Sequence, residues 1–141
     1  MNGELFLQLG EELVERRTPC DCRAAIGRAY YGVFNTVSAM MRQNGLHVDE
    51  GSAAHQKIWY DLLNCGIDEL RLPGSQLGDL HGMRVKADYK MHNELPEHYQ
   101  TAKFWVEEAR THLETIKVAF QGLRGSQTVA AIKQYRKSVG R

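Results

Sequence analysis

The chain has 141 residues, of which 43% are hydrophobic and 25% are charged, and its formal net charge is +1. This size and composition predict one globular domain, and the small net charge excludes a uniformly basic surface, so a role with nucleic acid needs a local basic patch. No apolar stretch approaches the roughly 20 residues of a membrane span. Acidic side chains at Glu4, Glu11 and Glu12 also interrupt the start of the chain. We therefore expect no signal peptide and no membrane helix.

Two helices are expected in the first third of the chain. Residues 4–16 carry leucines with a period of four, which is typical of an amphipathic helix. Residues 19–43 show the clearest pattern, with Thr18 as N-cap, Pro19 at the first helical position and Gly45 just beyond the end. The apolar arc of this second helix consists of Ile26, Ala29, Tyr30, Val33, Phe34, Val37, Met40 and Met41.

The middle of the chain predicts two further helices. Residues 53–65 form the third expected helix, with Ile58, Leu62 and Cys65 on one face, and Gly66 stops it. Residues 67–74 are interpreted as a connection. The fourth expected helix covers about 76–91, with Ser75 as a plausible N-cap.

The last long helix is expected at residues 97–123. Its apolar positions follow the 3-4 spacing of a packed helix seam, and they are Tyr99, Ala102, Val106, Ala109, Leu113, Ile116, Phe120 and Leu123. No segment alternates between apolar and polar residues as a strand would. The pattern predicts an all-α fold, an up-and-down antiparallel bundle of four to five helices over residues 1–125. Residues 126–141 are expected to be a basic C-terminal tail or a short extra helix.

Cysteine usage and motifs indicate no cofactor. The three cysteines, Cys20, Cys22 and Cys65, are odd in number, and no further pair at a usual spacing completes a zinc site. A reduced, cytoplasmic protein fits this composition best. The sequence contains no phosphate-binding loop, no dinucleotide-binding glycine motif and no HExxH metal motif. We therefore predict neither a metal nor an organic cofactor.

One charged residue interrupts the apolar face of the fourth expected helix. Its seam runs Leu77, Leu80, Arg84, Ala87 and Met91, so that an arginine occupies an inward-facing position. Burying an unpaired guanidinium is costly, and Asp88 lies one turn further along the same helix. Two interpretations remain open. Arg84 and Asp88 can form a structural salt bridge, in the bundle or at a dimer seam, or Arg84 can grip a phosphate through its bidentate fork.

Other candidate residues surround this position in the predicted bundle. On the second expected helix Arg28, Tyr31, Asn35 and Arg42 form a polar stripe that suits binding of a nucleic-acid backbone, although an ordinary solvated face explains it as well. His81, three residues before Arg84, lies on nearly the same helix face, and His55 begins the third helix. Both are candidates for acid–base catalysis, with a surface or capping role as the alternative.

Two segments resemble motifs of the HEPN family of RNA-associated proteins. Residues 23–34, RAAIGRAYYGVF, are similar to the family's RAYYAxF helix, and residues 83–89, MRVKADY, are similar to its LRxxADY segment. The loop that leads to His55 is similar to the start of the family's third helix. The resemblance covers about residues 5–120. It implies a helical bundle that commonly forms a homodimer.

The resemblance also implies an association with RNA. Many relatives are metal-independent ribonucleases, often toxins paired with a nucleotidyltransferase-fold antitoxin, and others are non-catalytic RNA-binding or partner domains. The nuclease members carry an arginine followed, after four to six residues, by a histidine. Arg84 matches the arginine, but Tyr89 stands at the histidine position and His92 lies beyond it. A histidine titrates near neutrality, whereas a tyrosine ordinarily titrates near pH 10 and is better suited to stacking on RNA or donating a hydrogen bond.

The expected site therefore has a catalytic and a binding part. The catalytic candidates are Arg84, His55 and His81, and the RNA-binding candidates are Arg28, Tyr31, Asn35, Asp88 and Tyr89. If the protein cleaves RNA, it is expected to do so without a metal ion. The rival hypothesis is a non-catalytic module that docks onto a nucleotidyltransferase-fold partner, and such a partner could in addition modify the Tyr89 hydroxyl.

Overall fold

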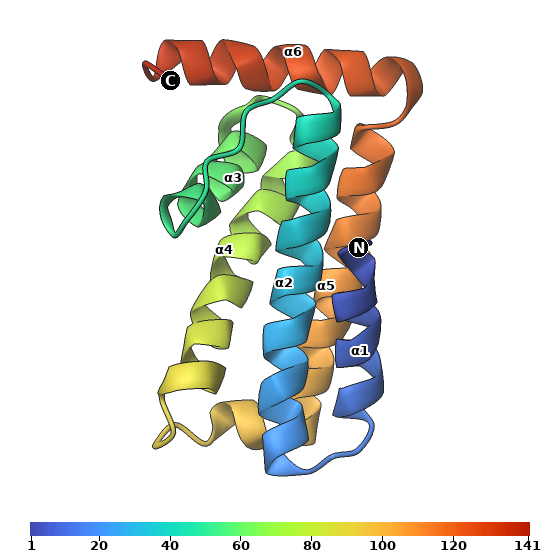
Figure 1. The fold of residues 1–141 in the computed structure, drawn as a ribbon, viewed down its shortest axis with the longest axis vertical. Helices are drawn as coiled ribbons and strands as arrows, with labels where there is room; N and C mark the ends of the chain where they lie inside the picture. The colour runs from blue at the N-terminus through green and yellow to red at the C-terminus, as the bar shows by residue number, and fades with distance from the viewer. The chain divides into compact units, whose positions relative to one another are not determined.

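The computed structural model describes residues 1–141 and contains six α-helices, one short 3₁₀ helix and no β-strand, which confirms the predicted all-α class. In chain order the elements are α1 (Glu4–Val14), α2 (Pro19–Gln43), α3 (Ala53–Asn64), α4 (Asp68–Tyr89), η1 (Leu95–Glu97), α5 (Tyr99–Ala119) and α6 (Gly122–Ser138) (Figure 1). The chain divides into two compact units. Unit 1 comprises Met1–Thr36 and Asp79–Thr111, and unit 2 comprises Val37–Gly78 and His112–Arg141.

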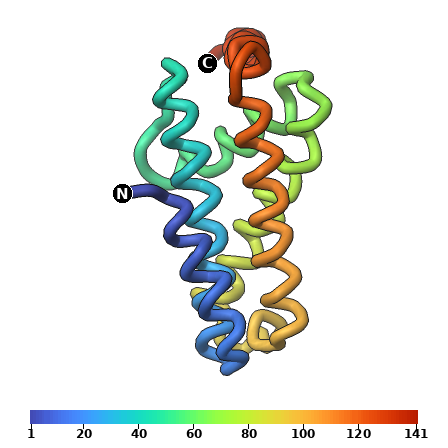
Figure 2. Tube along the Cα trace, turned by 90° about the vertical axis from the view of Figure 1, so that its right-hand side faces the viewer, coloured from blue at the N-terminus to red at the C-terminus, as the bar shows by residue number.

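Unit 1 contains α1 and the first part of α2, which run antiparallel and very close together. A Cβ atom on Gly32 would lie only 2.5 Å from the backbone nitrogen of Leu7, and one on Gly10 would lie 2.8 Å from the carbonyl oxygen of Ala25. Figure 2 shows α1 alongside this part of α2. Glycine is required at both positions because any side chain would push the two backbones apart. Thr18 caps α2 as predicted, its Oγ1 accepting a hydrogen bond from the backbone N–H of Asp21 at 3.1 Å.

Ion pairs join α1 to the first part of α5. Arg110 donates to Glu11 at 2.7 Å and lies 3.5 Å from Glu4, while Lys103 pairs with Glu15 at the other end of α1. These pairs show that α1 and α5 also run in opposite directions. Unit 1 is thus an antiparallel bundle of four helix segments, as the sequence predicts. Its largest completely buried side chains are Leu7, Val14, Ile26 and Tyr30.

A buried arginine fixes the end of α4 in unit 1. The guanidinium of Arg23, on α2, donates hydrogen bonds to the backbone carbonyls of Lys86, Ala87 and Asn93 at 3.1, 3.0 and 2.5 Å. It also pairs with Glu97 at 2.6 Å, and its side chain is only 11% exposed. The last carbonyls of a helix have no partner within the helix, and the helix dipole favours a cation at this end. Arg23 supplies both the donors and the charge.

In unit 2, α3 packs against the first part of α4, and the prediction for residues 67–74 is wrong. These residues are not a connection, because α4 already begins at Asp68 and continues through Pro73. A proline inside a helix costs about 3 kcal/mol. Close packing offsets this cost. Leu70 is fully buried, and a Cβ atom on Gly74 would lie 2.6 Å from the backbone nitrogen of Leu63 in α3.

The C-terminal part of unit 2 also differs from the prediction. The expected helix 97–123 is divided, because α5 covers only Tyr99–Ala119 and a new helix, α6, begins at Gly122, where φ is +58°. Leu123 is 88% exposed and therefore does not belong to the seam. Of the two alternatives for the C-terminal tail, the structure has the helix, and the predicted boundary at residue 125 falls inside it. Ile132 of α6 is fully buried.

Candidate functional site

The sequence-predicted arginine lies at the inner side of the last turns of α4, in unit 1. The Arg84 side chain is only 13% exposed, and its Nε atom lies 3.0 Å from Oδ2 of Asp88. The Nε–H group nevertheless makes no hydrogen bond. The contact is therefore an ion pair whose N–H does not point at the carboxylate oxygen. This arrangement holds the charge of Arg84 in balance but leaves part of its donor capacity unused.

Two tyrosine rings flank the guanidinium of Arg84. Its central carbon lies 4.9 Å from the ring centre of Tyr31, on α2, and 5.3 Å from that of Tyr89, at the end of α4. Nη2 also lies 3.5 Å from the Tyr89 hydroxyl, at the limit of a hydrogen bond. A cation within about 6 Å of an aromatic ring is attracted by its quadrupole. Tyr89 is 66% exposed, so one of the two rings faces solvent.

A histidine of the same helix completes this group. His81 is partly buried one turn before Arg84, and its ring centre lies 5.0 Å from that of Tyr30. Burial lowers the pKa of His81, and the nearby charge of Arg84 lowers it further. The imidazole is therefore neutral at pH 7 and able to accept a proton. We call His81, Arg84, Asp88, Tyr31 and Tyr89 the Arg84 cluster.

A glycine of α2 lets Asp88 approach the cluster. A Cβ atom on Gly27 would lie 3.3 Å from Oδ1 of Asp88, which is tighter than an ordinary contact. A side chain at position 27 would therefore require the Asp88 carboxylate to shift by a few tenths of an ångström. Residues 23–34 of α2 and residues 83–89 of α4 thus both contribute side chains to the cluster.

Three predicted site residues lie away from this cluster. The Arg28 guanidinium is placed over the ring of Phe6, in α1, at 5.5 Å. The Cβ atom of Asn35 lies 3.0 Å from the position a Cβ would take on Gly3. The expected stripe is therefore not one groove, because Arg28 and Asn35 lie beside the N-terminal segment while Tyr31 lies beside Arg84 of α4. His55 lies on α3 in unit 2, outside the unit that holds the Arg84 cluster.

Two buried charged residues were not singled out by the sequence analysis. Arg23 occupies a position seven residues before Tyr30 on the apolar arc of α2, and Asp61 lies three residues after Ile58 on the apolar face of α3. Asp61 is completely buried, and Arg136 and Arg141 bind its two oxygens at 2.7 and 2.8 Å. The signal that identified Arg84, a charge at an apolar position of a helix, is present for both residues.

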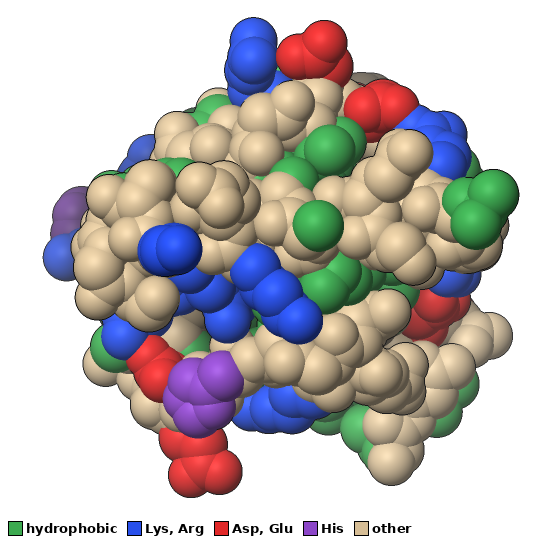
Figure 3. Space-filling view, turned by 90° about the horizontal axis from the view of Figure 1, so that it is seen from above, with side chains coloured by type: hydrophobic (Ala, Val, Ile, Leu, Met, Phe, Trp, Pro, Cys, Tyr) green, Lys and Arg blue, Asp and Glu red, His purple; other side chains and the backbone are tan.

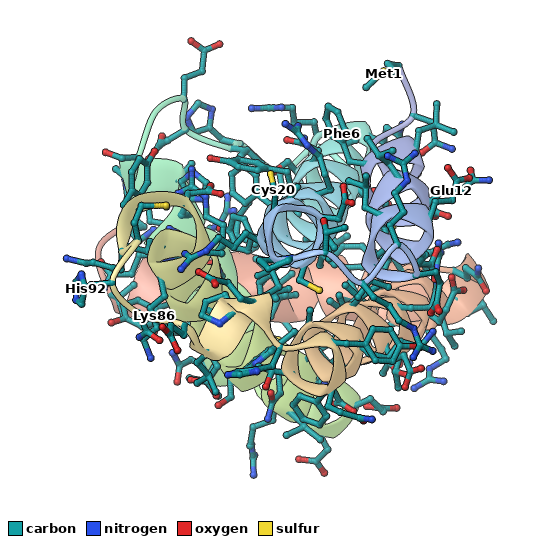
Figure 4. The ribbon with its side chains drawn as sticks, turned by 90° about the horizontal axis from the view of Figure 1, so that it is seen from below. Met1, Phe6, Glu12, Cys20, Lys86 and His92 are labelled. Carbon is teal, nitrogen blue, oxygen red and sulfur yellow. The ribbon has the colours of Figure 1, made fainter.

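Four further features of the chain concern possible metal ligands, the cysteines, His92 and membrane-spanning helices. No group of three or more His, Cys, Asp or Glu side chains is arranged to hold a metal ion. The three cysteines are free thiols: Cys20 is exposed, Cys22 is buried and Cys65 is half-buried. His92, close to the end of α4, is exposed and points outward in Figure 4. None of the helices combines the length and the apolar character that a membrane span requires.

Comparison with known proteins finds no relative of this chain. No protein-family model, no curated protein and no solved structure gives a significant match to the chain. The class that the fold and the site define is thus an all-helical protein with a half-buried arginine held between two tyrosines and a carboxylate.

Proposed function

We propose that this chain is a HEPN-type RNA-associated protein in which Arg84 contacts an RNA phosphate. The observation that carries the proposal is the environment of the Arg84 guanidinium, which is 13% exposed and lies between the rings of Tyr31 and Tyr89. RNA-binding sites combine a cation for the phosphate with aromatic rings on which bases stack. Here both occur within one cluster, and the exposed Tyr89 ring is the surface for stacking.

The cluster also has the groups for RNA cleavage without a metal ion. Such cleavage needs a base for the 2′-hydroxyl, an acid for the leaving oxygen and a cation that stabilises the phosphorane. A neutral His81 serves as the base, because its pKa is lowered by burial and by Arg84. Arg84 stabilises the developing charge, and the Tyr89 hydroxyl, 3.5 Å from Arg84 Nη2, donates a proton. In this proposal the protein is a cytoplasmic, homodimeric ribonuclease of a toxin–antitoxin or defence system.

The test is RNA binding and cleavage by variants of Arg84 in the presence of EDTA. Arg84→Ala is expected to weaken binding of a labelled single-stranded RNA about tenfold or more and to lower the salt slope by about 0.7. Cleavage, followed on a denaturing gel, is expected to disappear with it. Arg28→Ala is the matched control, since it removes the same charge from an exposed arginine outside the cluster. An Arg84→Ala protein that is folded and binds RNA like the wild type would contradict the proposal.

A second substitution separates a phosphate site from a structural salt bridge. Asp88 competes with a phosphate for Arg84, so Asp88→Asn is expected to strengthen RNA binding several-fold while the fold is retained. Asp88 is 35% exposed but Arg84 only 13%, so the substitution is expected to lower stability less than the loss of a completely buried ion pair would. If Arg84 and Asp88 serve only the structure, Asp88→Asn lowers stability and leaves RNA binding unchanged.

The alternative function is a non-catalytic module that docks onto a nucleotidyltransferase-fold partner. The presence of Tyr89 where the nuclease members carry a histidine favours this alternative, as does the compensation of Arg84 by Asp88 within the chain itself. A wild-type protein that binds RNA in EDTA without cutting it, or that forms a complex with a nucleotidyltransferase encoded beside it, would favour the module over the nuclease. Light scattering of the purified chain tests the proposed homodimer.

A further inference from the structure

Unit 2 contains a cavity that the Arg84 cluster does not use. It has a volume of about 380 Å³ and lies between α3, the loop before it and the end of α6. Small-molecule sites usually have volumes of about 300–1,000 Å³, so this cavity is large enough for a small organic ligand. Figure 3, which views the chain from the side of α6, shows Lys and Arg side chains gathered next to acidic side chains and a histidine.

Two carboxylates hold the basic side chains of this cavity in place. Asp61 is completely buried and binds Arg136 through one oxygen and Arg141 through the other. Asp49 binds Lys57 and, at 2.8 Å, the ring of His47. The hydrogen bond from Lys57, followed by that from His47, lowers the pKa of Asp49, so both partners face an ionised carboxylate. These ion pairs thus hold Arg136, Arg141 and Lys57 at the cavity without a ligand.

The basic side chains of the lining outnumber its acidic side chains and keep free donors. Its charged side chains are Lys57, Arg136 and Arg141 against Asp49 and Asp61, one more cation than anions. Each of the three guanidinium nitrogens of Arg136 already donates a hydrogen bond, two to Asp61 and one to the carbonyl of His47 at 2.8 Å. Arg141 uses only Nη1, at 2.8 Å from Asp61 Oδ1. Its Nε–H and Nη2–H groups therefore remain available to an anion.

The other part of the lining is apolar. Val48, Ala54 and Ile58 contribute hydrocarbon to the same cavity. A ligand that uses the whole space has to combine an anionic head with an apolar or aromatic body. A phosphate monoester fits the head better than a carboxylate does, because three oxygens accept from Lys57 and Arg141 at once, whereas one guanidinium fork already satisfies a carboxylate. We propose that this cavity binds a small phosphate monoester that carries an aromatic ring, its phosphate on Arg141 and Lys57.

The test uses adenosine monophosphate as the probe and titration calorimetry as the measurement. The wild-type chain is expected to bind the nucleotide saturably and to bind adenosine about tenfold or more weakly, since adenosine lacks the charge-assisted hydrogen bonds of the phosphate. Arg141→Gln and Lys57→Gln are each expected to weaken binding about tenfold. Both variants should fold, because Asp61 keeps Arg136 and Lys57 is 43% exposed. Circular dichroism and the Tm of each variant check the folding.

The control substitution is Lys137→Gln, which removes one positive charge from α6, four residues before Arg141, at a residue outside the cavity lining. It is expected to leave nucleotide affinity unchanged, and so is Arg84→Ala, which keeps this site separate from the proposed RNA site. The proposal is overturned if the folded wild type shows no saturable binding of the nucleotide at about 1 mM. It is also overturned if adenosine binds equally well, or if binding persists in the folded Arg141→Gln and Lys57→Gln variants.

Discussion

Arg23 serves more backbone groups than any other side chain of the site region. Its guanidinium binds three carbonyls near the end of α4 at 3.1 Å or less and the carboxylate of Glu97. Arg23→Ala removes these donors and leaves the Glu97 carboxylate and the helix end without their partner. We expect the free energy of unfolding to fall by about 3–5 kcal/mol, as for other buried ion pairs that lose one member. Urea unfolding followed by circular dichroism measures the change.

Arg28→Ala is the control for Arg23→Ala, because both arginines lie on α2. Arg28 is exposed and contacts only the ring of Phe6, at 5.5 Å. Its removal should change stability by no more than about 0.5 kcal/mol. Equal effects of the two substitutions would show that Arg23 does not hold the end of α4.

The partly buried His81 predicts a dependence of stability on pH. Burial, and then the charge of Arg84, lower the pKa of His81 below the ordinary value of 6.5. Between the two values the unfolded chain binds more protons than the folded chain, so the free energy of unfolding falls as the pH falls through this window. The stabilisation is complete above pH 6.5. Urea unfolding between about pH 7.5 and pH 5 should show this slope, which His81→Gln reduces and His92→Gln, at an exposed position, does not.

For single residues, the sequence predicted that Arg84 is central to the site, but it predicted only some of the residues that surround Arg84. A charge at an apolar helix position identified Arg84, and helix spacing paired it with Asp88. The same reasoning applies to Arg23 and Asp61 but was not extended to them. A single helix pattern also cannot say which neighbouring helix covers each edge of a polar stripe. For that reason Tyr31 lies beside Arg84 whereas Arg28 lies beside α1.

Among the helices, α4 departs most from its sequence pattern. Helix periodicity and capping predicted α1, α2 and α3 to within two residues, because their apolar faces and end signals agree. In α4 the sequence interpretation made residues 67–74 a connection, but the helix runs through Pro73, and Gly74 packs closely on α3. Local signals cannot report such a close approach, since it depends on residues of another helix.

Two glycines of α4 should respond to alanine in opposite directions. Nothing lies within 4 Å of a Cβ atom placed on Gly82, which is exposed, so Gly82→Ala should raise the free energy of unfolding by about 0.5–1 kcal/mol through helix propensity. At Gly74 the same atom would lie 2.6 Å from the backbone of Leu63, so Gly74→Ala should lower it by about 1–3 kcal/mol. Thermal and urea unfolding of both variants measures the pair. A stabilising Gly74→Ala would mean that α3 and α4 are further apart than described.

At the scale of the whole molecule, the C-terminal segment is part of the folded structure and belongs to unit 2. Arg136 and Arg141 bind a carboxylate that lies 75 and 80 residues earlier in the chain. A basic tail with no acid of its own gives no indication of such a partner, because its sequence is equally typical of a solvated segment. The structure thus places the last residues of the chain in unit 2.

The ion pairs of Asp61 predict a strong and recoverable loss of stability. The double substitution Arg136→Gln and Arg141→Gln leaves a completely buried carboxylate without a cation, and we expect a loss of about 3–5 kcal/mol. Adding Asp61→Asn should restore much of it, because the unpaired charge is then removed. The control is the double substitution Lys133→Gln and Lys137→Gln. It also removes two positive charges, both from α6, and should change stability little. If the triple variant is no more stable than the double one, the buried charge is not the cause.

At the start of α2, two thiols separated by one residue have opposite surroundings, since Cys20 is exposed and Cys22 is buried. Burial, and then the charge of Asp21, raise the pKa of Cys22, which leaves it little of the reactive thiolate form. An alkylating reagent will therefore modify Cys20 in the native protein and reach Cys22 only when this end of the helix detaches. The rate at which Cys22 itself is modified, followed by mass spectrometry of the peptide that contains it, therefore reports how often the start of α2 opens.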